Sequence, residues 1–509
     1  MSTVAAANPQ GSFLDRYFRF DENRTTMRRD TIAGVTTFIV MSYIIFVNPQ
    51  ILGFAGIPGL EERGLPFDGV LTSTCLVAGV MTIAMGLFTN KAYAIAPGLG
   101  LNAVVAFTLV ANEGLGFPEA MGLVVVEGLA ITLLVLIGLR ESIMRAIPLE
   151  LKKAIAIGIG LFIAFIGLTN SGLVIRGEGT PVDLAPLTTW PVLVTIFGLL
   201  LTVGLRARGF PGDLLVGIVV TTILATILNY AFDAYEGQPY AKWPDDVFQG
   251  PNFELVGEIS FDAFTTLPFI AAIAFAFSLF LADFFDTMGT LVGVGRQAGY
   301  LDAHGEMPDV KKPLLVDSLA AVAGGAASAS SATTYIESAS GVGVGGRTGW
   351  VSVVTGALFF PFMFLAPIIG MVPPQATAPA LIIVGWLMIS VLSELEDEAE
   401  VEELGGEALR HNPPGDREPM RAEARPPERK LAGIDFHDVA VGISAALVIM
   451  LMPFTFSITD GIAAGFIVYV VIRLFQGQAA RVHPLMYASA IAFTLYFLVP
   501  LLQQELSWI

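Results

Sequence analysis

The sequence predicts an all-α polytopic membrane protein whose 14 transmembrane segments form two inverted halves of seven. Three observations predict this class. Apolar residues make up 54% of the 509 residues and charged residues only 14%, against about 25% charged in soluble proteins. The mean hydropathy is +0.71. Apolar runs of about 17 to 25 residues, long enough to cross a bilayer, recur along the whole chain.

Charge and residue usage exclude several function classes. The net charge of −18 argues against a nucleic-acid surface. The single cysteine, Cys75, excludes an intramolecular disulfide, and the four histidines lie outside the apolar runs, so we expect neither a metal centre nor a cofactor. The first 27 residues lack the apolar stretch of a cleaved secretory signal. The first apolar run is therefore expected to remain as a span.

The apolar runs give the predicted spans in order. They lie near 31–54, 70–88, 119–139, 149–170, 187–205, 211–231, 266–282, 349–371, 377–393, 437–456, 458–475 and 484–502. Three further segments are apolar enough for the membrane but are poor helices: 92–112, 312–329 and 330–346. The last segment, 484–502, is either an added span or a helix lying against the bundle.

Two of the poor helices are interrupted in the middle. Residues 92–112 carry Pro97, Gly98 and Gly100, and residues 330–346 are small, polar and β-branched, with Glu337 inside. Irregular backbone at membrane depth survives only when it is buried in protein or lines a cavity. We therefore expect two half-helices that face each other at a binding site.

The basic residues test this count. With the N-terminus inside, all but three of the 27 Lys and Arg residues fall in inside loops, the exceptions being Arg63, Arg176 and Lys242. The positive-inside rule expects such a split. The spans then divide seven and seven around an acidic loop after Tyr230, with an interrupted segment third in each half. This arrangement is typical of an inverted-repeat transporter.

Carboxylates at membrane depth are costly and usually functional. Asp283 and Asp286 are spaced i, i+3 on one predicted helix face, followed by Thr287 and Thr290. Such a like-charged pair is expected to keep at least one proton, unless it lies at a wet helix end. Glu337 lies in a segment that favours extended backbone, where free N–H groups beside it suit a heterocycle.

Two further polar residues lie in apolar runs. Asn102 follows the break in the first interrupted segment and either contacts a ligand or caps a helix. Glu127 is expected to make a structural hydrogen bond to a neighbouring helix, with a supporting or proton-coupling role as the alternative.

Four strings resemble the AzgA-like branch of the nucleobase–cation symporter-2 (xanthine/uracil permease) family, whose members are permeases for hypoxanthine, guanine and adenine. They are NKAYAIAPGLGLNAVVAF (90–107), LADFFDTMGTLVGV (281–294), SSATTYIESASGVGVGGRTG (330–349) and VPPQATAPALIIVG (372–385). The resemblance runs from about residue 12 to 488. It implies a multi-pass symporter of the plasma membrane and not an enzyme, with the N-terminus in the cytoplasm. Such a symporter would import purine bases together with H⁺ or Na⁺ by alternating access.

The resemblance also implies site residues. Asp283 matches the span-8 acid that bonds the base, Glu337 the span-10 glutamate and Asn102 the span-3 asparagine. Asp286 matches the second span-8 acid and is expected to have a proton-coupling or supporting role. Tyr335 and Ile336 would lie in a span-10 strand, paired antiparallel with one in span 3, and present backbone N–H groups. Thr287 stands near the place where the uracil and xanthine branches often carry histidine, which favours purines.

The implied division alternates a core and a gate domain. The ranges are a cytoplasmic N-terminus (1–27), core spans 1–4 (28–140), gate spans 5–7 (141–232), an extracellular acidic loop (233–265), core spans 8–11 (266–371), gate spans 12–14 (372–475) with an acidic cytoplasmic linker (394–435), and a C-terminal hydrophobic segment (476–509).

Several alternatives stay open beside this assignment. A sulfate/bicarbonate-type anion carrier would share the fold, but the buried carboxylates would repel an anion. An intramembrane aspartyl protease needs Tyr-Asp and Gly-x-Gly-Asp strings, which do not occur. An open channel suits the split repeat less well. The preferred purine, H⁺ against Na⁺, and a homodimer all stay open.

Overall fold

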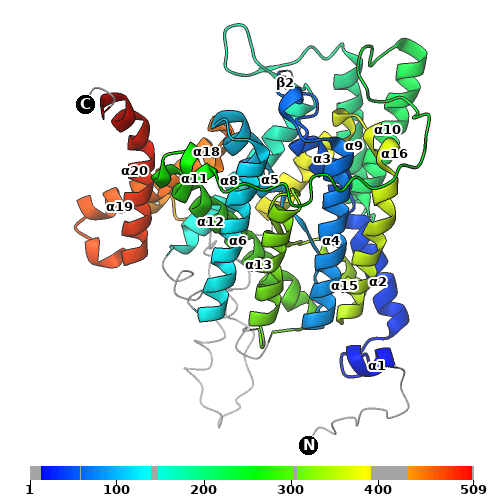
Figure 1. Cartoon of the computed structure of the whole chain (residues 1–509), viewed down its shortest axis with the longest axis horizontal. Helices are drawn as coiled ribbons and strands as arrows, with labels where there is room; N and C mark the ends of the chain where they lie inside the picture. The colour runs from blue at the N-terminus through cyan, green and yellow to red at the C-terminus, as the bar shows by residue number, and fades with distance from the viewer. Residues whose placement is uncertain (1–12, 58, 139–146, 302–306, 391–433, 507–509) are drawn as a thin grey trace, which may run out of the picture.

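The computed structural model describes residues 13–57, 59–138, 147–301, 307–390 and 434–506. Within them the chain is mostly helical (Figure 1). Eight helices are long and apolar enough to cross a membrane. They are α2 with α3 (Met27–Met41, Ile44–Leu52), α4 (Phe67–Thr89), α6 (Phe117–Ile137), α8 (Leu149–Asn170), α9 (Trp190–Ala207), α10 (Asp213–Phe232), α12 (Phe269–Ala298) and α19 (Ile458–Phe475).

Shorter helices complete the bundle. Those of apolar character are α5 with the π-helix η2 (Leu99–Ala103, Val104–Asn112), α15 with η3 (Gly349–Phe359, Phe360–Phe364), a helix at Pro374–Ser390, α18 (Val439–Thr455) and α20 (Pro484–Leu506). The others are α1 (Phe13–Phe18), η1 (Glu61–Arg63), α11 (Ala263–Thr266), α13 (Lys311–Ala326), α14 (Ser338–Gly343), α16 (Ala366–Gly370) and η4 (Ala479–Arg481). The described residues thus do not by themselves establish a count of 14 spans.

Strands are few. Within the described residues they are β1 (Ile95–Pro97), β2 (Val174–Ile175), β3 (Asp183–Leu184) and β4 (Ala332–Thr334). The strands β2 and β3 form a small hairpin in a loop, whereas β1 pairs with β4, more than two hundred residues later, inside the bundle. The expected antiparallel pairing of the two interrupted segments is therefore present.

Three sequence expectations need correction. Residues 312–326 lie in a regular helix, α13, rather than a poor one, because the small Ala and Gly side chains let it pack closely against α6, whereas 327–329 lie beyond its end. The run 349–371 breaks into α15, η3 and α16, with a proline in each of the last two. The run starting at 266 continues as α12 to Ala298, so Asp283 and Asp286 lie inside a helix and not at its end.

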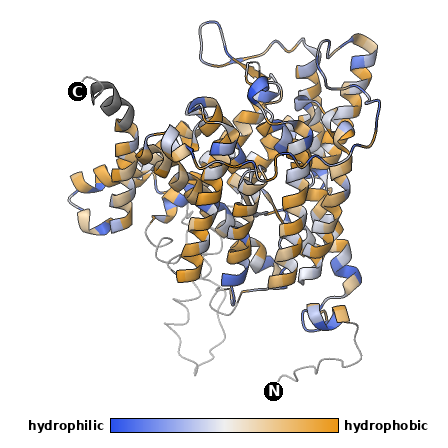
Figure 2. Cartoon of the chain, viewed as in Figure 1, coloured by the Kyte–Doolittle hydropathy of each residue, from blue (hydrophilic) through white to orange (hydrophobic). Residues whose placement is uncertain are grey.

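The helices separate into a buried centre and an apolar periphery. Figure 2 shows apolar residues along most helices, with hydrophilic residues gathered in the loops and at helix ends. The most apolar stretch of α2 with α3 is 72% buried, whereas that of α9 is only 28% buried. Since α9 and α10 lie at one end of the bundle and α19 and α20 at the other (Figure 1), these end helices present apolar side chains outward, as lipid-facing helices do.

Small residues let central helices approach closely. A Cβ added at Gly160 on α8 would lie 2.6 Å from the carbonyl oxygen of Gly385, and one at Gly385 would lie 2.3 Å from the carbonyl oxygen of Gly160. Such contacts between small residues are how membrane helices gain packing energy, because lipid supplies no hydrophobic drive between them. The pair α8 and 374–390 is therefore a fixed contact of the bundle.

The loop between α10 and α12 lies across one end of the bundle (Figure 1). Backbone hydrogen bonds hold this loop to the rest of the bundle at several points. The Ala241 amide donates to the Met371 carbonyl at 2.8 Å, and the Ser260 amide donates to the Pro118 carbonyl at 2.9 Å. The acidic loop expected from the sequence is thus an ordered cover for this end.

The entry to α18 is held by one carboxylate. Asp438 accepts from the Ala440 amide at 2.9 Å and from the Arg473 guanidinium at 2.7 Å. Burial acts to raise the pKa of the Asp438 carboxyl, but these hydrogen bonds outweigh it and hold the pKa below its usual range. The ionised side chain therefore caps α18 and joins it to α19.

Candidate functional site

The two interrupted segments cross in the middle of the bundle. Strand β1 pairs with β4 in the register Ile95–Thr334, Ala96–Thr333 and Pro97–Ala332. Each strand runs into a short helix, β1 into α5 and β4 into α14. Pro97 and Gly98 keep the first segment extended, and Ser330, with a φ of +71°, turns the chain into the second.

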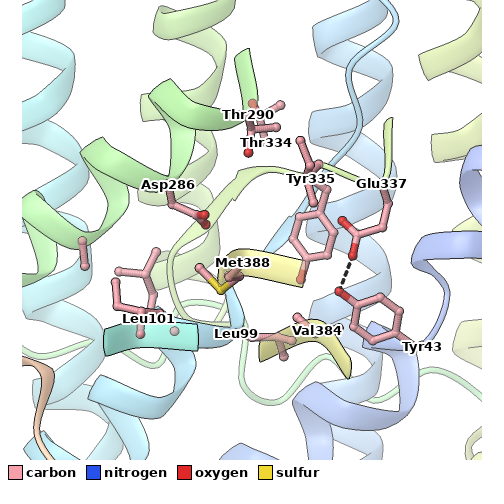
Figure 3. A pocket seen from close by; sticks show the side chains of 15 residues that line it. Tyr43, Leu99, Leu101, Asp286, Thr290, Thr334, Tyr335, Glu337, Val384 and Met388 are labelled. Carbon is pink, nitrogen blue, oxygen red and sulfur yellow. Dashed lines mark hydrogen bonds between the residues drawn. The ribbon is translucent and has the colours of Figure 1, made fainter. Parts of the chain in front are cut away.

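A pocket lies beside this crossing (Figure 3). It holds about 530 Å³ of space free of protein atoms, part of it open to solvent. One wall comes from α12, with Ala282, Asp286 and Thr290 at every fourth residue. The β1–α5 and β4–α14 segments provide most of the rest. The remaining lining residues come from α8 (Ile159), the helix 374–390 (Val384, Met388) and the α2–α3 junction (Tyr43).

Two acidic side chains line the pocket. Asp286 enters from α12, and Glu337 from the turn before α14 (Figure 3). Glu337 is 7% exposed, and its Oε1 accepts a hydrogen bond of 2.7 Å from the Tyr43 hydroxyl. Among the described residues that line the pocket there is no lysine, arginine or histidine.

The lining defines the chemistry of a ligand. The two carboxyl groups can accept hydrogen bonds from N–H groups, and Leu99, Ile159 and Val384 supply apolar surface around them. Because the pocket offers carboxyl groups without a cationic partner in its lining, it suits a small neutral ligand with N–H donors better than an anion.

The other expected site residues lie behind the pocket wall. Asp283 is 1% exposed, and neither of its carboxyl oxygens accepts a hydrogen bond from a donor group of the described residues. Glu127 is equally buried and accepts a long hydrogen bond of 3.4 Å from Ser331. Neither lines the pocket. This hydrogen bond joins α6 to the turn before β4 and not to a neighbouring helix.

Asn102 and Thr287 also make protein contacts instead of lining the pocket. The Asn102 amide donates to Asn48 Oδ1 at 2.6 Å, and its own carbonyl oxygen is buried without a partner. The Thr287 hydroxyl donates to Asp317 Oδ2 at 2.6 Å and lies 2.7 Å from the Thr333 hydroxyl. In this structure both side chains hold the two interrupted segments in place and do not face the pocket.

Tyr335 and Ile336 line the pocket, but they do not lie in a strand. Strand β4 ends at Thr334, and these residues form the turn that leads into α14. The Tyr335 amide donates to the Ala94 carbonyl at 2.9 Å, and the Tyr335 hydroxyl donates to the Pro97 carbonyl. The Tyr335 amide is therefore occupied by the β1 segment, contrary to the expectation that it faces a ligand.

Three supporting residues escaped the sequence analysis. Asp317 on α13 accepts from the Thr334 amide at 2.7 Å and hydroxyl at 2.6 Å, in addition to Thr287. Asn48 joins Asn102 to Thr74, and Tyr43 orients Glu337. The signal for Asp317 was a lone carboxylate in the Ala/Gly-rich segment 312–329. Tyr43 and Asn48 carried no signal, because their roles depend on segments distant in sequence.

No group of three or more His, Cys, Asp or Glu side chains suited to a metal ion occurs in the described ranges.

Sequence comparison identifies the family. The xanthine/uracil permease model, described as a permease family, matches residues 28–403. The adenine permease AdeQ of Escherichia coli K12 is 37% identical over 94% of this chain and 94% of its own length. The guanine/hypoxanthine permease PbuG of Bacillus subtilis is 36% identical over 95% of this chain and 99% of its own.

Solved structures agree at the level of the fold. The transmembrane domain of the cyanobacterial bicarbonate transporter BicA covers 71% of this chain and 89% of its own, with a TM-score of 0.51 and 16% identity. SLC26A9 covers 91% of this chain and 67% of its own, with a TM-score of 0.55 and 13% identity. At such identities the likeness shows the fold alone.

The sequence relatives are transporters and not enzymes, and they span nearly the whole chain. Together with the family match and the multiple apolar helices, they make this a multi-pass membrane permease: the chain belongs to the xanthine/uracil permease family, the nucleobase–cation symporter-2 family.

Proposed function

We propose that this protein imports the purine nucleobases hypoxanthine, guanine and adenine together with a proton, by alternating access, across the plasma membrane. The observation that carries the proposal is the pocket at the strand crossing, whose polar groups include the carboxyl groups of Asp286 and Glu337. The names of the relatives, adenine permease and guanine/hypoxanthine permease, support the substrate class.

Glu337 is the principal base contact. Its Oε1 is held by Tyr43, which leaves Oε2 to accept from a ring N–H. Asp286, on the opposite side of the pocket in Figure 3, accepts from or donates to a second edge of the base, according to its protonation. Since Asp286 and not Asp283 lines the pocket, we assign direct contact to Asp286 and a supporting position to Asp283, Asn102 and Thr287.

The architecture we propose is a seven-plus-seven inverted repeat with a core and a gate domain. The contacts between the halves support this architecture because they come in matching pairs: α4 packs on α15, and α6 packs on α13. Each half also carries one segment that is interrupted by a strand. The gate contributes α8 and the helix 374–390. Alternating access follows because the pocket lies between these helices and the core, so their relative movement would open it to either side.

The distribution of basic residues supports a cytoplasmic N-terminus as part of this proposal. The oligomeric state of the purified protein tests whether it forms a homodimer.

An anion carrier on the same fold is the second candidate, favoured by the likeness to BicA and SLC26A9. The pocket argues against it, because the described part of its lining has two carboxyl groups and no cationic side chain. Anion sites of this kind need positive potential.

The decisive experiment is uptake of radiolabelled hypoxanthine in cells that lack their own purine permeases. Expression should confer saturable uptake that unlabelled hypoxanthine, guanine or adenine inhibits, and that uracil, sulfate or bicarbonate does not. Glu61→Gln, at an exposed position of η1, serves as a charge-matched control and should transport like the wild type. Uptake inhibited by sulfate or bicarbonate and not by purines would establish the anion carrier instead.

A further inference from the structure

Glu127 and Asp283 form a buried carboxyl pair behind the pocket wall. Glu127 lies on α6 and Asp283 on α12, two helices that pack together, and each side chain is 1% exposed. The two carboxyl groups interact directly, and neither oxygen of Asp283 nor Oε1 of Glu127 has another hydrogen-bond partner among the described residues. Because carboxylates have only acceptor atoms, this contact requires a proton on one of them.

The groups around the pair offer no positive charge. Asp317 from α13 faces both carboxyl groups, and Asp286 faces Asp283 from one turn along α12. From the turn before β4, the Ser331 hydroxyl donates to Glu127 at 3.4 Å. No lysine, arginine or histidine of the described ranges acts on either carboxyl group. A second negative charge on the pair would thus be buried without a counter-ion.

Ser331 links the pair to the pocket. While its hydroxyl bonds to Glu127, its carbonyl accepts a hydrogen bond of 2.8 Å from the amide of Gly98, which lines the pocket. Ser331 also immediately precedes β4, the strand that pairs with β1. A change of charge on the pair therefore acts directly on the backbone of the strand crossing.

We propose that the Glu127–Asp283 pair carries the coupling proton, at a site separate from the purine pocket of Asp286 and Glu337. This inference rests on the proposed purine–proton symport. In the loaded state the pair shares one proton and bears a single negative charge. On release the O–H bond breaks, the proton passes to water on the inner side, and two carboxylates remain. The repulsion between them then moves Ser331 and loosens the crossing, which lowers the affinity for the base.

The test uses the purified full chain in liposomes, loaded with a trapped pH-sensitive dye and supplied with radiolabelled hypoxanthine. Glu127→Gln should retain hypoxanthine counterflow within about threefold of the wild type, because exchange needs no net proton movement. Its accumulation driven by a pH gradient, and the acidification that accompanies uptake, should fall by roughly tenfold or more. Asp283→Asn should show the same split, and Glu61→Gln should show neither loss.

Infrared spectroscopy provides a readout that needs no transport. The wild type should show a carboxylic-acid C=O band near neutral pH that shifts on ¹³C-aspartate labelling, and both variants should lose or shift it. This measurement reports on the pair even if hypoxanthine does not move at all in the wild type, a result that would overturn the proposed function instead.

Three outcomes of the transport and infrared measurements would overturn the inference. They are gradient-driven accumulation and acidification by Glu127→Gln at the wild-type level, a C=O band unchanged in both variants, and wild-type accumulation that follows a sodium gradient and ignores a protonophore. Loss of hypoxanthine binding in Asp283→Asn as complete as in Glu337→Gln would also refute it, since Asp283 would then be a base contact.

Discussion

Replacing Glu337 by glutamine perturbs the proposed base contact with little change of volume. In the structure one carboxyl oxygen of Glu337 accepts from Tyr43 at 2.7 Å, and the other is available to a ring N–H. In the glutamine variant the amide oxygen can still accept from Tyr43, but the amide N–H₂ then meets the ring N–H, donor against donor. We expect a loss of about 1.5–3 kcal/mol, or roughly 10- to 150-fold in hypoxanthine affinity.

Tyr43 gives a second measure of the same contact. Tyr43→Phe removes the hydrogen bond that orients Glu337 and leaves the carboxylate in place, so the expected loss of affinity is smaller, about 0.5–1.5 kcal/mol. In the Glu337→Gln background the same change should cost less, because the oriented carboxylate is already gone. This non-additivity is the signature of two residues acting on one contact.

The assay is equilibrium binding of radiolabelled hypoxanthine to the purified variants, with membrane expression and thermal midpoint measured in parallel. Glu61→Gln, exposed and distant from the pocket, controls for loss of a negative charge. Wild-type affinity in Glu337→Gln would remove Glu337 from the binding site. Strictly additive losses for the two substitutions would show that Tyr43 does not act through Glu337.

Three further outcomes follow from the structure. Asp317→Asn weakens the charge-assisted hydrogen bonds that hold strand β4, which are worth about 1.5–3 kcal/mol each. It should therefore lower the thermal midpoint and abolish hypoxanthine uptake, and an unchanged midpoint would contradict this. Gly160→Val should stop uptake and destabilise the protein by about 1–3 kcal/mol, since its side chain would collide with the Gly385 carbonyl, whereas Gly204→Ala, with no atom within 4 Å of the added carbon, should be neutral in both. Asp438→Ala should lose about 1 kcal/mol of helix capping at pH 7. Because the pKa of Asp438 is lowered in the folded state, this stabilisation is lost only when the carboxylate is protonated. The difference between the thermal midpoints of variant and wild type should therefore shrink below about pH 4 and not above it.

The membrane character and the broken segments follow from local sequence. Length and hydropathy decide whether a run can lie in a bilayer, and Pro97 with Gly98 interrupts a helix wherever it is placed. The antiparallel pairing of the two interrupted segments and the family membership, both inferred from the sequence resemblance, are confirmed. Such features need little knowledge of which segments become neighbours.

The different roles of the two acids of α12, in contrast, do not follow from local sequence. Residues spaced i, i+3 differ by roughly 60° around a helix, so the sequence places Asp283 and Asp286 on one broad face without deciding which direction is the pocket. The packing of α12 decides it: Asp286 shares its line with the pocket residues Ala282 and Thr290, while Asp283 turns toward α6 and Glu127.

The supporting residues were likewise decided by tertiary structure. Asp317 acquires its role from Thr334 and Thr287, and Tyr43 from Glu337, which lies 294 positions away. A buried polar side chain must find a partner, and the sequence states that need without naming the partner. Composition and local pattern thus determined that this chain is a membrane protein with two broken segments, the second of which holds Glu337, and with further acids at membrane depth. Only the packing of distant segments against one another determined which acids line the pocket and which contact each other. That outcome depends on small differences in the rotation and separation of neighbouring helices.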